Sequence, residues 1–303
     1  MVEVRPYRDE DRDALLSFMR ASFENEVDEA HCESLISDSA GIWLATASEG
    51  TALAGFCRLV PDEETRARRR ACMDILSIGE GPDRIAVGGA LIAAVRGDAD
   101  PKEYDGIWGY FTEPLGRDFL DATNGAQLRE IRLFRNDQLD DFSPPKLPEG
   151  YRLRPVSLPG DLELASGIYN DTFSKMWNFR PHGQEDIAHW FEGRETAPQD
   201  CLILVRERKG GAPDDGAGIA VLAVDAARLK NADPVGYVPD IGVAGAHRRK
   251  GLGKALMSAI AERAREKGLA AIELIADDRD PAAKSFYRSL SFSEMGKITV
   301  YEW

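Results

Sequence analysis

The sequence has few cysteines and no long hydrophobic run. No two of its four cysteines have a short spacing: Cys32, Cys57, Cys72 and Cys201. That spacing predicts no metal site and no disulfide framework. No segment approaches the length of a membrane span, and the start of the chain has no apolar signal region. We therefore expect no metal, no membrane partner and a cytoplasmic location.

Basic charge is also scarce. The chain has 38 Lys and Arg against 52 Asp and Glu, for a net charge of −14. Residues 1–148 carry 17 basic and 29 acidic side chains, whereas residues 149–303 carry 21 and 23. Nucleic acid is excluded as a partner because neutralising its phosphates needs a basic face. The nearly neutral second half does not repel an anionic ligand, and the acidic half is read as a solvated surface.

The most informative feature present is a glycine-bearing turn at residues 248–254, Arg-Arg-Lys-Gly-Leu-Gly-Lys. It follows an apolar segment at 237–243 and precedes a run with helical spacing at 255–267. A strand, a turn and a helix in that order aim free backbone N–H groups at an anion. The turn is not a P-loop, which needs Ser or Thr after the lysine, and it lacks the third glycine of a dinucleotide fingerprint.

The turn resembles the pyrophosphate-binding turn of the GNAT superfamily of acyl-CoA-dependent N-acyltransferases. The family pattern, Arg/Gln-x-x-Gly-x-Gly/Ala after the fourth strand, is matched by Arg248, Gly251 and Gly253, with Val243 ending the strand. The resemblance spans about residues 150–303.

A second family motif follows in the expected order. The usual form, Asn-x-x-Ala-x-x-Leu/Phe-Tyr and then Leu-Gly-Phe, is matched at Ala283, Phe286, Tyr287, Leu290 and Phe292. Two positions depart from it. Asp280 replaces the Asn and is expected to cap the helix equally well. Ser291 replaces the Gly and must adopt the backbone angles that glycine usually supplies.

The order of predicted elements agrees with the resemblance. In the second half we expect strands at 151–155, 201–206, 219–225, 237–243, 270–275 and 293–303, with helices at 161–172, 184–191 and 255–267. The first half repeats the plan, with strands at 2–7, 42–46, 53–59, 71–78, 106–111 and 128–134 and helices at 9–23 and 85–95.

The repeat indicates an internal duplication with one competent site. The counterpart of the phosphate turn, residues 78–84, contains two acids, and Pro82 removes an amide donor. We predict a degenerate GNAT-like domain at 1–143, a proline-rich linker at 144–150 and a catalytic domain at 151–303. The fold class is α/β (α+β), with two GNAT-like domains, each a mixed, mostly antiparallel central sheet flanked by helices. The layout is similar to that of the mycothiol synthase group.

The resemblance implies acetyl-CoA as the acyl donor. Its pyrophosphate would bind at the turn and its pantetheine arm along the preceding strand. The cofactor-binding residues so implied are Ile241, Val243, Arg248, Arg249, Lys250, Gly251, Leu252, Gly253, Lys254 and Asp280.

The resemblance also implies an acid for the departing thiolate. Tyr287 matches the usual general acid of the family. A neutral amine must also be presented, which costs about 4–5 kcal/mol for an ordinary primary amine at neutral pH. The alternatives for the base are Asp240 acting through a water molecule, Tyr237 with a perturbed pKa, or a group elsewhere in the chain. Tyr237 stands where several family members have a Glu.

The acceptor pocket is expected near the helix pair after residue 155. Aromatic and imidazole side chains gather there, although such spacing is more often that of a core: Phe173, Trp177, Phe179, His182, His189 and Trp190. We predict an N-acetyltransferase that transfers an acetyl group to a small-molecule amine by direct attack. The alternatives are a non-catalytic acyl-CoA sensor and an acyltransferase for longer acyl groups or oxygen acceptors. A homodimer is a possible assembly that the sequence does not decide.

Overall fold

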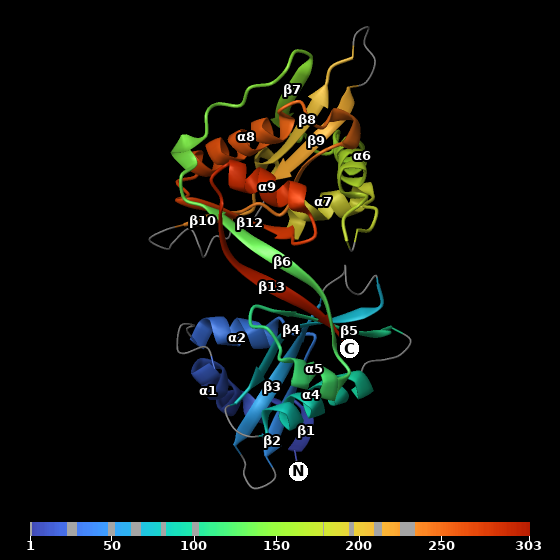
Figure 1. Ribbon diagram of the computed structural model, residues 1–303, viewed down its shortest axis with the longest axis vertical. Coiled ribbons are helices and arrows are strands. Elements are labelled where there is room, and N and C mark those ends of the chain that lie inside the picture. Colours follow the sequence, from blue (N-terminus) through green and yellow to red (C-terminus); the bar gives the residue numbers. More distant parts are fainter. Residues whose placement is uncertain are drawn as a thin grey trace. The chain divides into compact units, whose positions relative to one another are not determined.

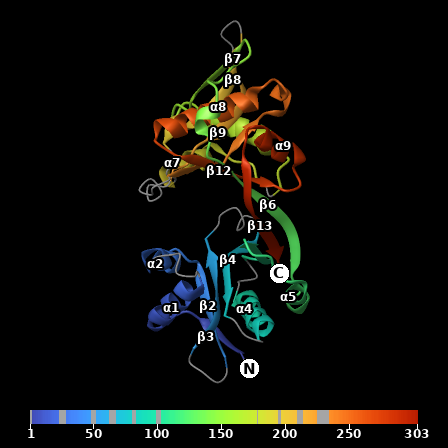
Figure 2. The same cartoon turned by 60° about the vertical axis from the view of Figure 1, so that its left-hand side comes forward.

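The computed structural model describes residues 2–22, 29–47, 52–61, 68–79, 83–98, 103–177, 179–193, 197–208, 214–224 and 234–303. The chain divides into two compact units: unit 1 is Met1–Ile131 with Lys297–Trp303, and unit 2 is Arg132–Gly296. Each unit has a largely antiparallel sheet with helices on both faces (Figures 1 and 2). The predicted fold class is confirmed. Within the described ranges, no helix has both the length and the apolar character that crossing a membrane requires.

Unit 1 is built on one sheet. Its strands, in order across the sheet, are β1 (Val2–Pro6), β2 (Gly41–Ala47), β3 (Leu53–Val60), β4 (Arg70–Ile78), β5 (Gly106–Phe111) and the end of β13 (Ser293–Glu302). Only β4 and β5 run parallel among these pairs. One core lies under α1 (Arg12–Ser22) and α2 (Glu29–Ser37). The other lies under α4 (Arg84–Asp98) and α5 (Arg117–Thr123).

Unit 2 repeats this plan with a divided sheet. An antiparallel part contains β7 (Tyr151–Pro155), β8 (Cys201–Arg206), β9 (Asp215–Val221) and β11 (Ile241–Val243). A second part contains β10 (Val235–Tyr237), β12 (Ala271–Asp277) and β6 (Ala126–Asn136), of which residues 132–136 belong to this unit. The helices are α6 (Leu162–Phe173), α7 (Gln184–Gly193), α8 (Leu252–Glu266) and α9 (Pro281–Ser289).

Alternation along the strands separates two cores in unit 2. Ile203 and Ile219 belong to the core under α6 and α7. Their neighbours Leu204 and Ala220 belong to the core under α8. Successive side chains of a strand point to opposite faces, so a strand buried on both faces reads as a continuous apolar run.

The two closing strands differ from the expectation. The sequence pattern predicts that residues 128–134 form the last strand of the first half and that residues 293–303 form the last strand of the second half. Instead, Thr299–Glu302 of β13 pair with Trp108–Phe111 of β5 in unit 1, and Phe134 of β6 lies in the core of unit 2. The two strands have similar lengths and alternation, so pattern alone does not decide which unit's core each completes. The predicted boundaries at 143 and 151 stay a prediction. In the structure, residues 132–143 pack with unit 2 and residues 297–303 pack with unit 1.

Candidate functional site

The strand expected at 237–243 is broken into two. β10 pairs in parallel with β12, whereas β11 pairs antiparallel with β9. The Val238 N–H still donates to the carbonyl of Glu273 at 2.8 Å, but the Asp240 carbonyl accepts from Val221 of β9 at 2.8 Å. Pro239 stands between them and has no N–H to continue the ladder. β11 is therefore left as the edge strand of its sheet.

The outer edge of β11 presents free backbone groups. Asp240 and Ala244 both bond to β9, at 2.8 and 2.9 Å. Because antiparallel bonding alternates, Ile241 and Val243 direct their N–H and C=O groups away from β9. The Val243 carbonyl accepts from Nε of Arg248 at 2.8 Å. Among the described residues, nothing bonds to the backbone of Ile241 or to the N–H of Val243 on this edge. An extended ligand with amides can pair there.

The bend between β11 and α8 is open and its amides are unpaired. Arg249 and Gly251 adopt left-handed backbone angles, with φ of 64° and 80°, and α8 begins at Leu252. Its first backbone bond runs from Ala255 N–H to the Gly251 carbonyl, at 3.1 Å. No described group accepts from the N–H groups of residues 249–254, and no side chain caps the helix. These N–H groups, with the helix dipole behind them, form an anion site.

Two of the four cations around the bend are engaged by the protein itself. Arg248 donates to the carbonyls of Val243 and Thr172, and Lys250 donates to the Tyr151 hydroxyl at 3.0 Å. Arg249 and Lys254 are exposed and form no ion pair within the described part of the chain. Local positive charge is thus available to a diphosphate without an acidic partner already in place.

The second motif lies at α9 and behaves as expected. The Asp280 carboxylate caps the helix by accepting from Ala283 N–H at 2.9 Å. Ser291 adopts a φ of 64°, the left-handed conformation expected of it. Tyr287 is 7% exposed and packs against Phe134 with ring centroids 5.7 Å apart. Burial raises the pKa of Tyr287, and the charges of nearby groups raise it further, so the phenol stays protonated.

The two candidate bases lie on different sides of the broken strand. Tyr237 interacts with Tyr287 and is one of the groups that raise its pKa. Asp240 interacts instead with Cys201, whose thiol pKa is raised to about 12 by burial first and by Asp240 second. Cys201 belongs to the core under α6 and α7. Asp240 lies two residues before Gly242, whose added Cβ would meet α6, so alternation places Asp240 on the face of the helix pair, while Tyr237 lies near Tyr287 of α9.

The helix pair contains an aromatic cluster whose centre the sequence analysis missed. Tyr169 has ring centroids 4.8 Å from Phe173, 4.4 Å from His182 and 5.1 Å from Trp190. These three partners are each less than 10% exposed, so they are core residues. Tyr169 lies within an expected helix, and only its spacing of four residues from Phe173 could have indicated it.

One polar group beside β11 is left without a partner. The buried hydroxyl of Thr172 makes no hydrogen bond to any described residue. A Cβ added to Gly242 would lie 2.3 Å from Cγ2 of Thr172. Glycine at 242 is therefore what lets α6 approach the strand so closely. The Thr172 hydroxyl lies on the same side of β11 as α6.

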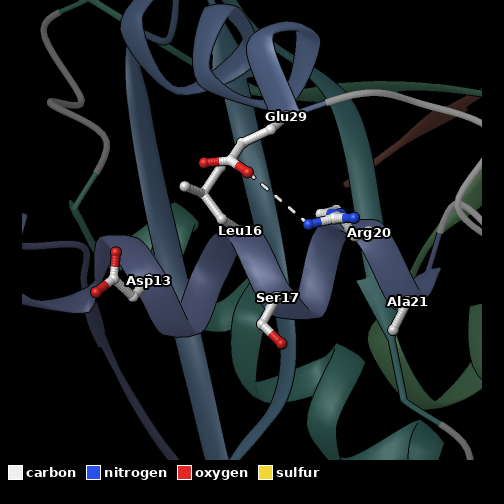
Figure 3. A pocket seen from close by; sticks show the side chains of 6 residues that line it. All are labelled: Asp13, Leu16, Ser17, Arg20, Ala21 and Glu29. Carbon is white, nitrogen blue, oxygen red and sulfur yellow. Dashed lines mark ion pairs between the residues drawn. The ribbon is translucent and has the colours of Figure 1, made fainter.

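A separate hollow of about 420 Å³ lies in unit 1 (Figure 3). It is lined by Asp13, Leu16, Ser17, Arg20, Ala21 and Glu29. An ion pair of 3.8 Å between Arg20 and Glu29 spans it. It is open to solvent, and it lies in the unit that lacks the glycine turn.

Comparison with known proteins agrees with this geometry. Residues 164–292 match the model of the acetyltransferase (GNAT) family. A mycothiol acetyltransferase of Renibacterium salmoninarum is 32% identical over 170 residues, which cover 52% of this chain and 48% of that protein. A mycothiol acetyltransferase of Thermobispora bispora is 26% identical over 259 residues, covering 84% of this chain and 81% of that protein.

Two solved structures show the same fold over the full length. A GCN5-related N-acetyltransferase from Sphaerobacter thermophilus has a TM-score of 0.71 at 16% identity and covers 100% of this chain and 95% of its own. A tandem GNAT protein from the clavulanic acid biosynthesis pathway has a TM-score of 0.69 at 17% identity, covering 100% and 98%. The resemblance predicted from the glycine turn is confirmed: residues 164–292 belong to the acetyltransferase (GNAT) family, and the full chain has the fold of tandem GNAT structures.

Proposed function

We propose that the chain transfers an acetyl group from acetyl-CoA to the amine of a small molecule, with unit 2 as the catalytic unit. The observation that carries the proposal is the bend at residues 249–254, where the N–H groups at the start of α8 have no acceptor among the described residues. The name mycothiol acetyltransferase, shared by two relatives, supports acetyl as the group transferred.

The residues present fit the donor in two places. The amides of Gly251, Leu252, Gly253 and Lys254 would hold the pyrophosphate, with Arg249 and Lys254 adding charge. The helix dipole contributes about 0.3–2 kcal/mol. The free backbone groups of β11 at Ile241 and Val243 would pair with the amides of the pantetheine arm. Asp280 supports the same side of the site through the helix that it caps. The bound thioester supplies an activated acyl group.

Tyr287 is proposed as the acid that protonates the departing thiolate. Its buried phenol has a raised pKa and so retains its proton at neutral pH. Its position among Phe134, Phe286 and Phe292 fixes the ring and leaves the hydroxyl as its one polar group.

Asp240 is proposed as the base, acting on the amine through water. It faces the α6 and α7 side, as does the unpartnered Thr172 hydroxyl. A buried hydroxyl without a partner is costly unless a ligand or water satisfies it. Tyr237, on the α9 side, remains the alternative base. Presenting the amine neutral costs about 4–5 kcal/mol without such help.

Two measurements test the proposal. Calorimetry should show acetyl-CoA binding to the intact chain, and a thiol-release assay with a panel of small amines should show turnover. No heat at high micromolar acetyl-CoA would contradict the donor site. Tyr287→Phe separates the enzyme from a non-catalytic acyl-CoA sensor. In an enzyme it abolishes most turnover and leaves the affinity unchanged, whereas in a sensor there is no turnover to lose.

A further inference from the structure

A buried histidine next to the bend takes part in a network that the GNAT motifs do not include. Nδ1 of His247 lies 2.9 Å from the Tyr151 hydroxyl. That hydroxyl accepts from Nζ of Lys250 at 3.0 Å, and the ammonium also lies 5.6 Å from the centre of the Tyr151 ring. On its other side, Nε2 of His247 is 3.7 Å from Asp215. His247 is only 5% exposed.

The direction of each hydrogen bond follows from the chemistry of the groups. An ammonium can only donate, so the Tyr151 oxygen accepts from Lys250 and its own proton is free to go to His247. The approach of Nε2 to the Asp215 carboxylate, at 3.7 Å, favours the tautomer with the imidazole proton on Nε2, in which Nδ1 accepts from the Tyr151 hydroxyl. In this arrangement His247 is neutral.

The network lies beside a strained bend. Arg249 has a φ of 64°, a conformation that costs a residue with a Cβ roughly 1–2 kcal/mol. Such strain persists only where neighbours fix the backbone. The side chains on both sides of Arg249 are anchored: Arg248 to the carbonyls of Val243 and Thr172, and Lys250 to Tyr151 and the Ala246 carbonyl.

We infer that Tyr151 and His247 are positioning residues for the pyrophosphate-binding bend, and that protonation of His247 releases it. Through Lys250 they hold Arg249 in its strained conformation and so keep the amides of the bend directed outward. Arg248 and Lys250 are anchors of the bend before they are ligands of a phosphate. This inference rests on the proposed function, because it concerns how the same site is kept ready for coenzyme A.

Protonation acts against the network for two reasons. A protonated Nδ1 can no longer accept from Tyr151, and the imidazolium faces the charges of Lys250 and Arg206. Asp215 and Asp171 favour the charged form, but burial is the largest effect and lowers the pKa of His247. The imidazole is therefore neutral at pH 7 and above, and the anchor is lost as the pH falls through this lowered pKa, which lies below the usual histidine value of about 6.5.

Coenzyme A binding to the full-length chain, measured by calorimetry at about pH 8 and pH 5.5, tests the inference. Tyr151→Phe removes both hydrogen bonds and keeps the ring, and at pH 8 we expect about tenfold weaker binding. His247→Asn offers an oxygen near the position of Nδ1 that does not titrate. It should bind like the parent at pH 8 and lose less affinity at pH 5.5. Tyr104→Phe in unit 1 is the matched control and should change nothing.

The outcomes separate the two proposals. If the parent does not bind coenzyme A at pH 8, the proposed function fails and this inference falls with it. If the parent binds and Tyr151→Phe binds equally well while folded, only the positioning role is wrong. Phosphate groups of coenzyme A also gain protons near pH 6. If the parent and His247→Asn lose the same affinity at pH 5.5, the pH effect comes from the ligand, and the proposed release of the bend is wrong. Nitrogen NMR of the imidazole in the free protein should show the proton on Nε2, and the opposite tautomer would contradict the network.

Discussion

The two units share a plan and differ where a diphosphate would bind. Each begins with a strand ending in Arg-Pro, and each arginine pairs with an aspartate that begins the next helix, Arg5 with Asp11 and Arg154 with Asp161. In unit 1, β4 continues as one strand to Ile78 beside β3, with a β-bulge opposite Arg58 and Leu59, whereas in unit 2 the matching strand is broken before β11. The matching segment of unit 1 at residues 80–82, which includes Glu80 and Pro82, lies outside the described residues. Both copies have therefore kept the same framework, and the open bend is described in unit 2.

The last helix of each unit shows a second difference between the two units. In unit 2 the Phe292 N–H donates to the Tyr287 carbonyl at 3.1 Å, and in unit 1 the Gly125 N–H donates to the Leu120 carbonyl at 2.8 Å. Each pair closes around a residue with positive φ, 64° at Ser291 and 53° at Asn124. Leu120 is thus the structural counterpart of Tyr287. Unit 1 has no hydroxyl at the position proposed for the acid.

The largest expected effect comes from removing the hydroxyl of Tyr287, because its counterpart in unit 1, Leu120, has none. Tyr287→Phe should lower kcat by about 10²- to 10⁴-fold, the usual contribution of a positioned acid. The Kd for acetyl-CoA should be unchanged, because the ring and its packing remain. Steady-state kinetics and calorimetry on the same preparation measure both values. A kcat within a factor of about two of the parent would remove Tyr287 from the mechanism.

The exchanged strands provide the next largest effect. Trp303 is 6% exposed, packs on Phe111 and donates to Thr123, while Phe134 is fully buried in unit 2. Replacing either with alanine should cost about 3–5 kcal/mol of stability. Hydrogen exchange should show the loss of protection in unit 1 for Trp303→Ala and in unit 2 for Phe134→Ala. Loss of protection in unit 2 for Trp303→Ala and in unit 1 for Phe134→Ala would contradict this assignment of the two strands.

The exchange also shows what the sequence could predict. Apolar periodicity predicted most strands and long helices, because it depends on neighbours in the chain. The glycine turn and the Tyr287 motif were found because a ligand or a helix end demands particular residues at fixed spacing. The unit whose core β6 or β13 completes was not predictable, because alternation shows which face of a strand is buried but not what packs against it.

The Tyr151 and His247 network was missed for a related reason. Tyr151 begins one strand and His247 lies 96 residues later, so no local pattern joins them. Pro239 stands inside the apolar segment 237–243, whose continuous pattern predicts a single strand. Proline within a strand normally marks an edge or an interruption, and here the interruption creates the free edge of β11.

A smaller effect is expected from moving the proline of unit 1 into the bend of unit 2. Lys254→Pro removes one amide donor from the first turn of α8, where proline is best tolerated. Lys254→Met removes the charge and keeps the amide, so it is the matched control. The proline variant should bind acetyl-CoA about tenfold more weakly than the methionine variant, the usual value of one hydrogen bond to a charged group. Equal affinities would show that this amide does not contact the donor.

The smallest expected difference compares the two arginine–aspartate pairs. Hydrogen bonding to Arg154 is the main cause of the lowered pKa of Asp161, and Arg5 has the same effect on Asp11. A lowered carboxyl pKa stabilises the fold at pH values above the usual 3.9, and this stabilisation disappears as the pH falls through the lower folded value. Arg154→Met should therefore cost about 2 kcal/mol at neutral pH, because Asp161 is only 8% exposed.

Arg5→Met should cost less, about 1 kcal/mol or below, since the Arg5 side chain is 34% exposed and solvent weakens the pair. Urea denaturation between about pH 7 and pH 3 measures both costs, and each should shrink toward zero at the acidic end as the aspartates gain protons. The duplicated pair would then stabilise both copies by the same physics, with burial setting the difference. A cost for Arg154→Met that stays constant with pH would show that packing of the arginine stem, rather than its charge, is what the framework has kept in each copy.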